Sequence, residues 1–342
     1  MPQTVFLALL LVASILLTGL YRHLALRAHI LDIPVSRSAH SSPVPLGGGV
    51  VIVVLYLLGV SYYMNTDLLS FQQGMAMFAG LVVAAVGLLD DLNELKISVR
   101  IVLQLLAAAW ALWWLGGIPS ISLFGWTLEP SWFLNLLGLV ALVWLLNLYN
   151  FMDGIDGIAG VELVFVNAMS LLLVINKADG SVALLSQLLM VLALGFLVWN
   201  WAPAKIFMGD VGSGFIGFSL GIIAIISMQQ QSMTVWTWVI LLGVFITDAT
   251  VTLVRRFMAG ERWYLGHASH AYQKAAKRFN SHSKVSIAVT GINLFWLGPL
   301  AWWSLQHPEL GMVSALVAVV PLVLLAVWLE AGLSNDRVAT RG

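Results

Sequence analysis

The sequence contains no cysteine, and this absence excludes disulfide bridges and every metal site built from thiolates. A structural or catalytic cation would then suit oxygen ligands, which favours Mg²⁺ or Mn²⁺. Charged residues are also scarce, at 9% of the chain, whereas hydrophobic residues make up 60%. Soluble domains contain about a quarter charged residues. The composition therefore excludes a soluble globular protein and indicates an integral membrane protein.

Apolar runs long enough to cross a membrane recur along the whole chain. A helix needs about 20 apolar residues to cross about 30 Å of hydrocarbon. The sequence predicts an all-α polytopic bundle of eleven spans that forms one domain over residues 1–342, without an internal repeat. The spans are predicted at residues 4–21, 47–64, 71–89, 98–115, 132–149, 157–175, 181–201, 212–229, 233–254, 286–304 and 310–331.

Basic residues sort to one side of these spans. If the first span begins outside the cell, 15 of the 16 lysines and arginines fall in inner loops, and only Lys177 lies outside. The positive-inside rule then predicts an outside N-terminus and a cytosolic C-terminus. No basic residue precedes the first apolar run, so we expect a retained span rather than a secretory signal. The inner loops hold nearly every polar motif, which predicts a function at the cytosolic face.

Five aspartates lie at or just beyond the inner ends of spans. They are Asp90, Asp91, Asp153, Asp156 and Asp210. Adjacent carboxylates such as Asp90 and Asp91 repel each other unless a cation or a donor compensates their charge. A solvated loop pair is the alternative, but at the end of a span a functional pair is favoured. These aspartates predict chemistry on a charged, metal-bound substrate.

The densest motif runs from Asn147 to Gly160 and contains Asn150, Asp153 and Asp156. One Asp-Gly turn is ordinary in a loop, but two of them after two asparagines fit a binding loop better.

Asp210 stands just before a Gly-Ser-Gly sequence that begins the eighth predicted span. The start of a helix favours an anionic group such as phosphate. A helix N-cap role for Asp210 is the alternative, and the two roles can coexist. Glu162 and Asp248 lie inside predicted spans and are expected to face the protein interior, because charge at midspan is costly. For Asp248 a structural ion pair competes with a role in the site.

Basic side chains of the inner loops complete the candidate site. Arg37 and His40 lie in a loop whose prolines and glycines predict a fixed non-helical path, and a cation beside the membrane suits a phosphate. His267 and His270 lie in the longest inner loop, where topology and contact with anionic lipid are the alternative roles. Two histidines alone do not establish a metal site, so we expect donors to a nucleotide or pyrophosphate.

Together these motifs resemble the polyprenyl-phosphate N-acetylhexosamine-1-phosphate transferases of bacterial membranes. The resemblance covers residues from about 32 to 273. It rests on Asp90-Asp91 with Leu95, Arg100 and Gln104, on Asn150 to Gly157, on Ala204 to Asp210 with Gly212-Ser213, and on Arg255-Arg256 leading to the histidine loop. Many relatives carry His-x-His-His in that loop, where this chain has His267-Ala268-Ser269-His270. That departure resembles the branch that initiates O-antigen or related polysaccharide synthesis, and it argues against the peptidoglycan translocase.

The resemblance implies an enzyme of the bacterial inner membrane with its active site on the cytosolic face. It would transfer a sugar 1-phosphate from UDP-linked N-acetylglucosamine, N-acetylgalactosamine or N-acetylfucosamine to undecaprenyl phosphate and release UMP. Because the reaction brings two anions together, it needs a cation, Mg²⁺ or alternatively Mn²⁺, more than covalent chemistry. No nucleic acid partner is expected, and a homodimer is left open.

The resemblance also implies roles for single residues. The expected catalytic residues are Asp90, Asp91, Asp153 and Asp156. The expected Mg²⁺ ligands are Asp210 and, as a second contact, Asp91. The expected substrate contacts are Asn150, Asn200, Lys205, Arg37, His40, Arg256, His267 and His270. Since a phosphate monoester is mostly dianionic at pH 7, we expect Asp90 to act through metal geometry and charge placement rather than as a base. A covalent phospho-aspartate route is left open.

Two functions from other classes compete with this interpretation. An ion-coupled transporter would place its charges near the bilayer midplane, in repeated halves, whereas here they lie on the inner rim. A CDP-alcohol phosphotransferase shares Asp153-x-x-Asp156-Gly157, but its pattern continues with Ala-Arg, where this chain has Gly160-Val161.

Overall fold

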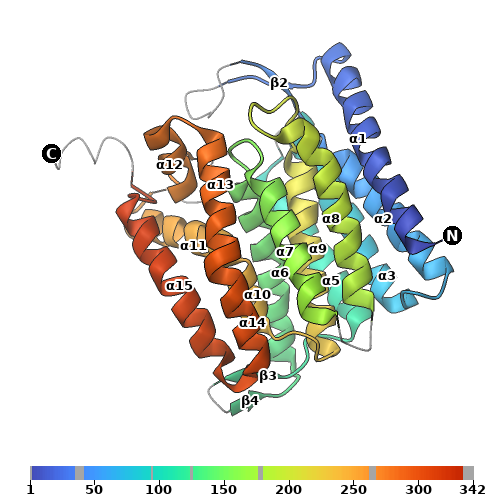
Figure 1. Ribbon diagram of the computed structural model, residues 1–342, viewed down its shortest axis with the longest axis vertical. Coiled ribbons are helices and arrows are strands. Elements are labelled where there is room, and N and C mark those ends of the chain that lie inside the picture. Colours follow the sequence, from blue (N-terminus) through green and yellow to red (C-terminus); the bar gives the residue numbers. More distant parts are fainter. Residues whose placement is uncertain are drawn as a thin grey trace.

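The computed structural model describes residues 2–34, 42–93, 95–123, 126–175, 180–261 and 267–333, which form a bundle of mostly upright helices (Figure 1). The first helices are α1 (Gln3–Arg27), α2 (Gly49–Asn65), α3 (Phe71–Phe78), α4 (Gly80–Leu92), α5 (Ile97–Leu115), α6 (Trp132–Met152) and α7 (Ile158–Val174). They are followed by α8 (Ser181–Asn200), α9 (Asp210–Gln229), α10 (Val235–Leu241), α11 (Gly243–Met258), α12 (Ala271–Phe279), α13 (His282–Ile292), the π-helix η1 (Asn293–Leu297), α14 (Gly298–Gln306), the 3-10 helix η2 (Pro308–Leu310) and α15 (Gly311–Trp328).

Each predicted span falls on a helix or on successive helices, so the all-α polytopic class is confirmed. Among the described residues, eight helical segments are long and apolar enough to cross a membrane, or nine if the bent pair α10 and α11 is one span. The two remaining predicted spans correspond to α2 and α7, which have 17 residues each. That length is about the lower limit for a crossing. Eleven crossings and the orientation of the chain stay predictions.

Two short antiparallel hairpins lie at opposite ends of the bundle (Figure 1), and neither is among the elements predicted from the sequence. One pairs β1 (Leu31–Asp32) with β2 (Val44–Pro45), and the other pairs β3 (Ile121–Leu123) with β4 (Trp126–Leu128). Strands of two or three residues are too short to leave an alternating pattern in the sequence. The first hairpin gives the loop after α1 the non-helical path that its prolines and glycines predict.

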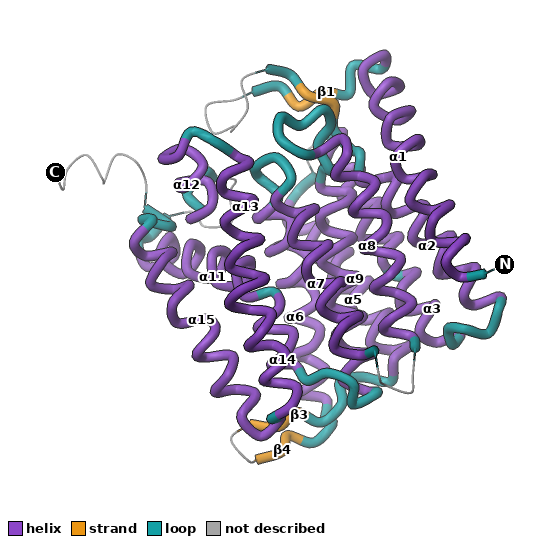
Figure 2. Tube along the Cα trace, viewed as in Figure 1, coloured by secondary structure: helices purple, strands orange, loops and turns teal. Residues whose placement is uncertain are grey.

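The predicted span 233–254 is wrong as one continuous helix. It breaks at Leu242 into α10 and α11, which meet with a bend of 80°. The backbone of Leu242 departs from helical values, with φ −94° and ψ 15°. Gly243 follows, and a side chain there would meet the methyl groups of Leu297 at about 3.2 Å. As a result α11 lies across the upright helices beside it (Figure 2).

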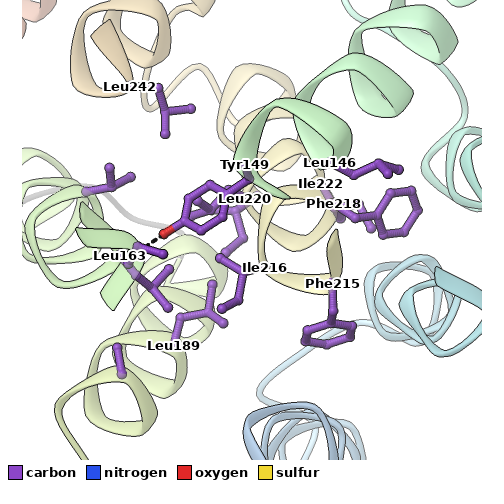
Figure 3. Packing of buried hydrophobic residues seen from close by; sticks show 14 of the residues in the cluster. Leu146, Tyr149, Leu163, Leu189, Phe215, Ile216, Phe218, Leu220, Ile222 and Leu242 are labelled. Atoms are coloured by element: carbon purple, nitrogen blue, oxygen red, sulfur yellow. Dashed lines mark hydrogen bonds between the residues drawn. The ribbon is translucent and has the colours of Figure 1, made fainter. Parts of the chain in front are cut away.

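Helix α9 lies at the centre of the bundle. Its side chains Phe215, Ile216, Phe218 and Leu220 are fully buried although they project to different sides (Figure 3). Helices α2, α4, α6 and α8 pack around it. A helix surrounded by protein is apolar on every face. The helix that begins at Asp210 is therefore enclosed by four neighbouring helices.

Glu162 of α7 and Asn293 of η1 form a fully buried polar pair in this interior. Asn293 Nδ2 donates to Glu162 Oε2 at 2.6 Å. Within the described residues, Glu162 Oε1 and Asn293 Oδ1 have no partner. A protonated Glu162 would satisfy both oxygens, because its O–H can donate to the amide oxygen while the amide N–H donates back. The expectation that Glu162 faces the interior is confirmed, and the pair fits a neutral acid.

We expect Glu162→Gln to leave the thermal unfolding midpoint of the purified protein nearly unchanged, because glutamine can make the same two hydrogen bonds without a charge. Glu162→Leu leaves Asn293 buried without a partner and should cost about 1–3 kcal/mol of stability. The measurement is heat-induced unfolding in detergent. Equal losses in the two variants would mean that Glu162 is charged and held by a partner other than Asn293.

Candidate active site

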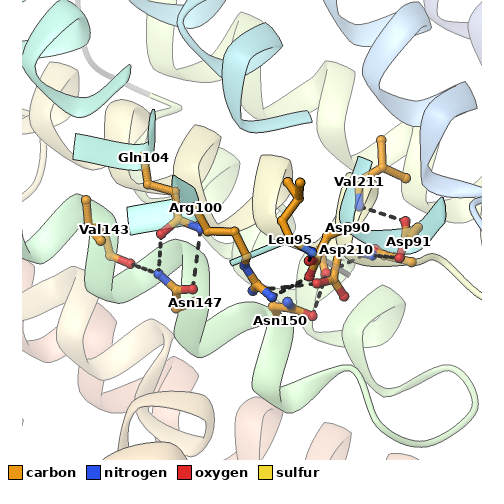
Figure 4. Close-up of polar contacts among 12 residues, drawn as sticks. Asp90, Asp91, Leu95, Arg100, Gln104, Val143, Asn147, Asn150, Asp210 and Val211 are labelled. Atoms are coloured by element: carbon orange, nitrogen blue, oxygen red, sulfur yellow. Dashed lines mark hydrogen bonds and ion pairs between the residues drawn. The ribbon is translucent and has the colours of Figure 1, made fainter. Parts of the chain in front are cut away.

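Four helix ends meet at the end of the bundle that carries the first hairpin. The last turn of α4 contributes Asp90 and Asp91, and the first turns of α5 contribute Arg100. The last turn of α6 contributes Asn150, and Asp210 is the first residue of α9. Figure 4 shows these side chains converging on one another. The structure thus brings together residues that are up to 120 positions apart in sequence.

Asp90 is held in place by its own loop and by Arg100. Its Oδ1 accepts the backbone N–H of Leu95 at 2.8 Å, and its Oδ2 forms an ion pair with Arg100 Nη1. Only 12% of the Asp90 side chain is exposed. Asp90 is thus already engaged by a backbone donor and a guanidinium, and its role in charge placement stays a prediction.

Arg100 also reaches Asp210, with 3.7 Å between Arg100 Nη2 and Asp210 Oδ2. The Asn150 side chain hydrogen-bonds to Asp210 as well. Asn150 is in turn oriented by Ser213, whose hydroxyl donates to Asn150 Oδ1 at 3.1 Å. The Asp210 carboxylate is therefore aimed by an arginine and an amide, and 31% of its side chain remains exposed.

Asp91 supplies the negative charge at the start of α9. Asp91 Oδ1 accepts the N–H of Asp210 at 2.9 Å, and Oδ2 accepts the N–H of Val211 at 3.2 Å. The N-cap residue itself is Gly209, which makes no side-chain cap. The N-cap role considered for Asp210 is therefore wrong. Asp91 satisfies these amides from another helix, and Asp210 is left to face the site.

Two glycines permit this close approach of α4 to α9. A Cβ atom on Gly87 would lie 2.5 Å from the carbonyl oxygen of Asp210, and one on Gly209 would lie 2.5 Å from Asp91 Oδ2. Gly209 also has φ +77°, a conformation that side chains other than glycine rarely adopt.

Asp153 follows the last residue of α6 and lies near the other carboxylates. Burial raises the pKa of the Asp153 carboxyl well above its ordinary value. The carboxylates of Asp210, Asp91 and Asp156, in that order, raise this pKa further. Besides burial, several negative charges therefore lie close together here. A cation from solution would relieve their repulsion.

Asp156 and Asn200 tie the loops of the site together. Asp156 Oδ2 accepts the N–H of Ala204 at 3.1 Å and lies 3.2 Å from His282 Nδ1 on α13. Asn200 is buried, and its amide accepts the N–H of Gly157 at 3.1 Å and donates to the carbonyl of Ile206 at 3.0 Å. The structure gives both residues a positioning role, and their direct contact with a substrate stays a prediction.

Asp248 holds the histidine loop against the site. It is buried and accepts the N–H groups of Ala271 and Tyr272, both at 2.8 Å, and it lies 3.2 Å from His270 Nδ1. Its expected burial is confirmed. Its partners are the start of α12 and a histidine, so it is a loop anchor, and no partner arginine is involved in the described residues.

The histidines stack beside the end of α6. The rings of His267 and His270 lie 4.9 Å apart and nearly parallel, and the ring of Phe151 lies 6.3 Å from His270. The Tyr272 hydroxyl donates to the carbonyl of Phe151 at 2.9 Å, which links α12 to the loop of Asp153. The histidine loop and the aspartates therefore belong to one site.

The remaining predicted residues differ in their placement. Arg256 forms an ion pair with Glu261 at 2.7 Å and donates to Ser269 at 3.3 Å, so it braces the histidine loop. Lys205 is exposed, and its Nζ lies 5.7 Å from the centre of the Trp199 ring. Arg37 and His40 lie outside the described residues, so their roles stay predictions.

Several residues of the site were not among the predicted contacts. Arg100 entered only through the resemblance, although a single arginine one turn inside an apolar run is a usable signal. Gln104 and Asn147 form an amide pair between α5 and α6, with 2.9 Å from Asn147 Nδ2 to Gln104 Oε1. For Tyr272 and Ser213 the residue type alone gives no signal, because their roles depend on tertiary contacts.

A divalent cation fits the donors of this site. Among the described side chains, no three Asp, Glu or His groups are arranged to enclose an ion by themselves. Mg²⁺ usually takes one or two carboxylates and completes its shell with water and substrate phosphates. Asp210, with Asn150 and Asp153 beside it, could hold such an ion. Both oxygens of Asp91 already accept backbone N–H groups, which makes Asp91 a weaker candidate.

Comparison with known proteins finds a matching family model and several relatives. The Glycosyl transferase family 4 model matches residues 73–228. The chain is 29% identical to a probable undecaprenyl-phosphate N-acetylglucosaminyl 1-phosphate transferase of Bacillus subtilis, over 82% of this chain and 78% of that protein. It is 28% identical to a decaprenyl-phosphate N-acetylglucosaminephosphotransferase of Mycobacterium leprae, over 90% of this chain and 87% of that protein.

A further relative comes from another branch. The chain is 29% identical to a phospho-N-acetylmuramoyl-pentapeptide-transferase of Streptococcus pneumoniae, over 61% of this chain and 66% of that protein. The region that the family model matches contains Asp90, Asp91, Asp153, Asp156 and Asp210. With the carboxylates gathered at one end of a helical bundle, these similarities support the resemblance to the polyprenyl-phosphate N-acetylhexosamine-1-phosphate transferase family.

Proposed function

We propose that this protein transfers N-acetylhexosamine 1-phosphate from a UDP-linked sugar to undecaprenyl phosphate and releases UMP. The observation that carries the proposal is the Asp210 carboxylate, partly exposed at the meeting point of four helix ends and held by Arg100 and Asn150. The names of the relatives from Bacillus subtilis and Mycobacterium leprae support the lipid phosphate and the sugar phosphate. The donor proposed is UDP-N-acetylglucosamine, UDP-N-acetylgalactosamine or UDP-N-acetylfucosamine.

The proposed place of the reaction is the cytosolic face of the bacterial inner membrane. The basic loops on the side of the site support this orientation through the positive-inside rule. We further propose that the product starts an O-antigen or related surface polysaccharide, because the histidine loop lacks the His-x-His-His pattern.

The proposed acceptor, undecaprenyl phosphate, has a long apolar chain and needs an apolar route to the aspartates. A cavity of about 420 Å³ lies between α11, α12, α13 and α15, and its walls are almost entirely apolar. Asp248 and Tyr272 form part of its lining, and Tyr272 also contacts the carbonyl of Phe151 next to the Asp153 loop. A polyprenyl chain that entered this cavity would carry its phosphate toward the site.

The protein's own residues act by orienting charge. Arg100 and Asn150 aim Asp210, Asp91 fixes the start of α9, and Asp248 fixes His270 beside the Asp153 loop. When Mg²⁺ is bound by Asp210, it supplies neutralisation of phosphate charge. In this proposal His267 and His270 donate to a phosphate of the UDP-linked sugar. Catalysis of phosphoryl transfer rests mainly on such positioning and electrostatics.

Membranes containing the protein should release UMP and form a lipid pyrophosphoryl sugar in equal amounts from one of the three proposed donors. EDTA should abolish the reaction, and Asp210→Asn should lower its rate by on the order of 10²–10³. UDP-N-acetylmuramoyl-pentapeptide is the control donor from the other branch. Formation of UMP from that donor alone would overturn the proposed sugar, and no UMP from any donor would overturn the proposed reaction.

Asp90→Asn should be impaired to a similar degree at pH 7 and pH 9. The lipid phosphate has a second pKa of about 6, so it is already mostly dianionic at pH 7 and needs little help from a base. The measurement is the initial rate of UMP release across this pH range, relative to the wild-type protein. Recovery of the variant's activity as the pH rises would show instead that Asp90 removes a proton.

Asp91→Asn should lower kcat and stability together while leaving the Mg²⁺ concentration for half-maximal activity unchanged. An asparagine can accept one of the two N–H groups but not both, and losing a helix-terminal acceptor costs about 0.5–2 kcal/mol. Asp67→Asn, at an exposed turn, is the matched control. A large increase in the Mg²⁺ requirement of Asp91→Asn would restore the predicted role as a metal ligand.

A further inference from the structure

Two cations share one tryptophan ring between α1 and α8. The Arg22 guanidinium lies 6.0 Å from the centre of the Trp199 ring, and Lys205 Nζ lies 5.7 Å from it. Arg22 Nε also donates to the backbone carbonyl of Lys205 at 3.0 Å. The ring itself is fixed, because Trp199 Nε1 donates to the carbonyl of Ile15 at 2.9 Å and Gly19 leaves room for it. The arrangement is therefore built by three separate segments of chain.

The two cations lack an anionic partner. Arg100 and Arg256 each form an ion pair with a carboxylate. Neither Arg22 nor Lys205 does so anywhere in the part of the chain that the structure describes. Each cation lies within about 6 Å of the same ring centre, and an anion that contacted both would compensate their charge.

The cluster lies at the end of two apolar stretches, where lipid headgroups are expected. The preceding turns of both helices expose apolar side chains, with 65% of Leu16 and 53% of Leu20 exposed on α1, and 40% of Leu194 and 56% of Val198 on α8. In a membrane protein such surfaces face acyl chains. Tryptophan, arginine and lysine then follow at the end of the apolar stretch, as they do at membrane interfaces.

We propose that Arg22 and Lys205, held over Trp199, bind the phosphate of an anionic membrane phospholipid. Guanidinium and ammonium groups are the usual protein donors to phosphate oxygens. The acyl chains of that lipid would lie along the exposed apolar side chains of α1 and α8. This binding site is separate from the apolar cavity between α11 and α15, and it does not rest on the proposed transferase activity.

The lipid site is connected to the active site through short contacts. The hydroxyl of Tyr21, next to Arg22, packs against Gly47. A Cβ atom on Gly47 would lie only 2.6 Å from that hydroxyl oxygen. Gly47 in turn lies against Gly209, the residue before Asp210. Arg22 also holds the carbonyl of Lys205, in the loop that leads to Gly209. A bound phospholipid would therefore steady the loop that ends at Asp210.

The test is lipid binding to the purified full-length protein, measured by native mass spectrometry with phosphatidylglycerol and phosphatidylcholine as probes. Wild-type protein should prefer phosphatidylglycerol. Arg22→Gln and Lys205→Gln should each weaken its binding about fivefold, the factor that corresponds to about 1 kcal/mol per basic residue at a membrane surface. Lys205→Gln keeps the hydrogen bond from Arg22 to the backbone, so it separates loss of charge from disturbance of the loop.

Arg27→Gln is the matched control, because Arg27 is an exposed arginine in the last turn of the same helix. It should leave phosphatidylglycerol binding unchanged. An equal loss in Arg27→Gln would mean that total charge attracts the lipid and that no site exists. Undecaprenyl phosphate is the second probe. If Arg22→Gln weakened that lipid and spared phosphatidylglycerol, the cluster would bind the phosphate of the acceptor and the proposal would be wrong.

Discussion

The two hydrogen bonds that Asp91 accepts from the first amides of α9 are the interaction on which the site depends. They join α4 to α9 at the point where Gly87 and Gly209 allow the two segments to approach closely. A helix start favours a nearby negative charge, and Asp91 provides it from another helix. Asp210 is consequently free to turn toward Arg100 and Asn150. Without this division of roles the two aspartates would compete for the same amides.

Buried polar groups hold the loops of the site, whereas apolar packing holds the bundle. Asn200 joins the Gly157 turn to the loop before α9, and Asp248 joins α11 to the histidine loop. Hydrogen bonds in a low-dielectric interior are directional and costly to leave unmade, so they define loop positions more sharply than apolar contacts do. The loops around Asp153 and His270 are therefore placed accurately although they lie outside the regular helices.

The strong local signals in the sequence were enough to predict the class of fold and to single out the aspartates that the structure brings close together. Apolar runs predicted the long helices of the bundle but not the short α12, and the clustered aspartates predicted the end of the bundle at which these residues meet. The role of Asp91 could not be predicted in this way, because its partners lie 119 and 120 residues away and helix caps are recognised from neighbouring residues. The break at Leu242 left only one weak signal, the following glycine.

The bend between α10 and α11 has a consequence for how the chain enters the membrane. Helix α10 has 7 residues and cannot cross alone, and α11 carries Asp248, Arg255 and Arg256. Both helices pack against α15, and α10 also packs against α14, both of which are synthesised later. The packing partners of this segment are thus completed only after it has been synthesised. Its final position depends on helices that leave the ribosome after it.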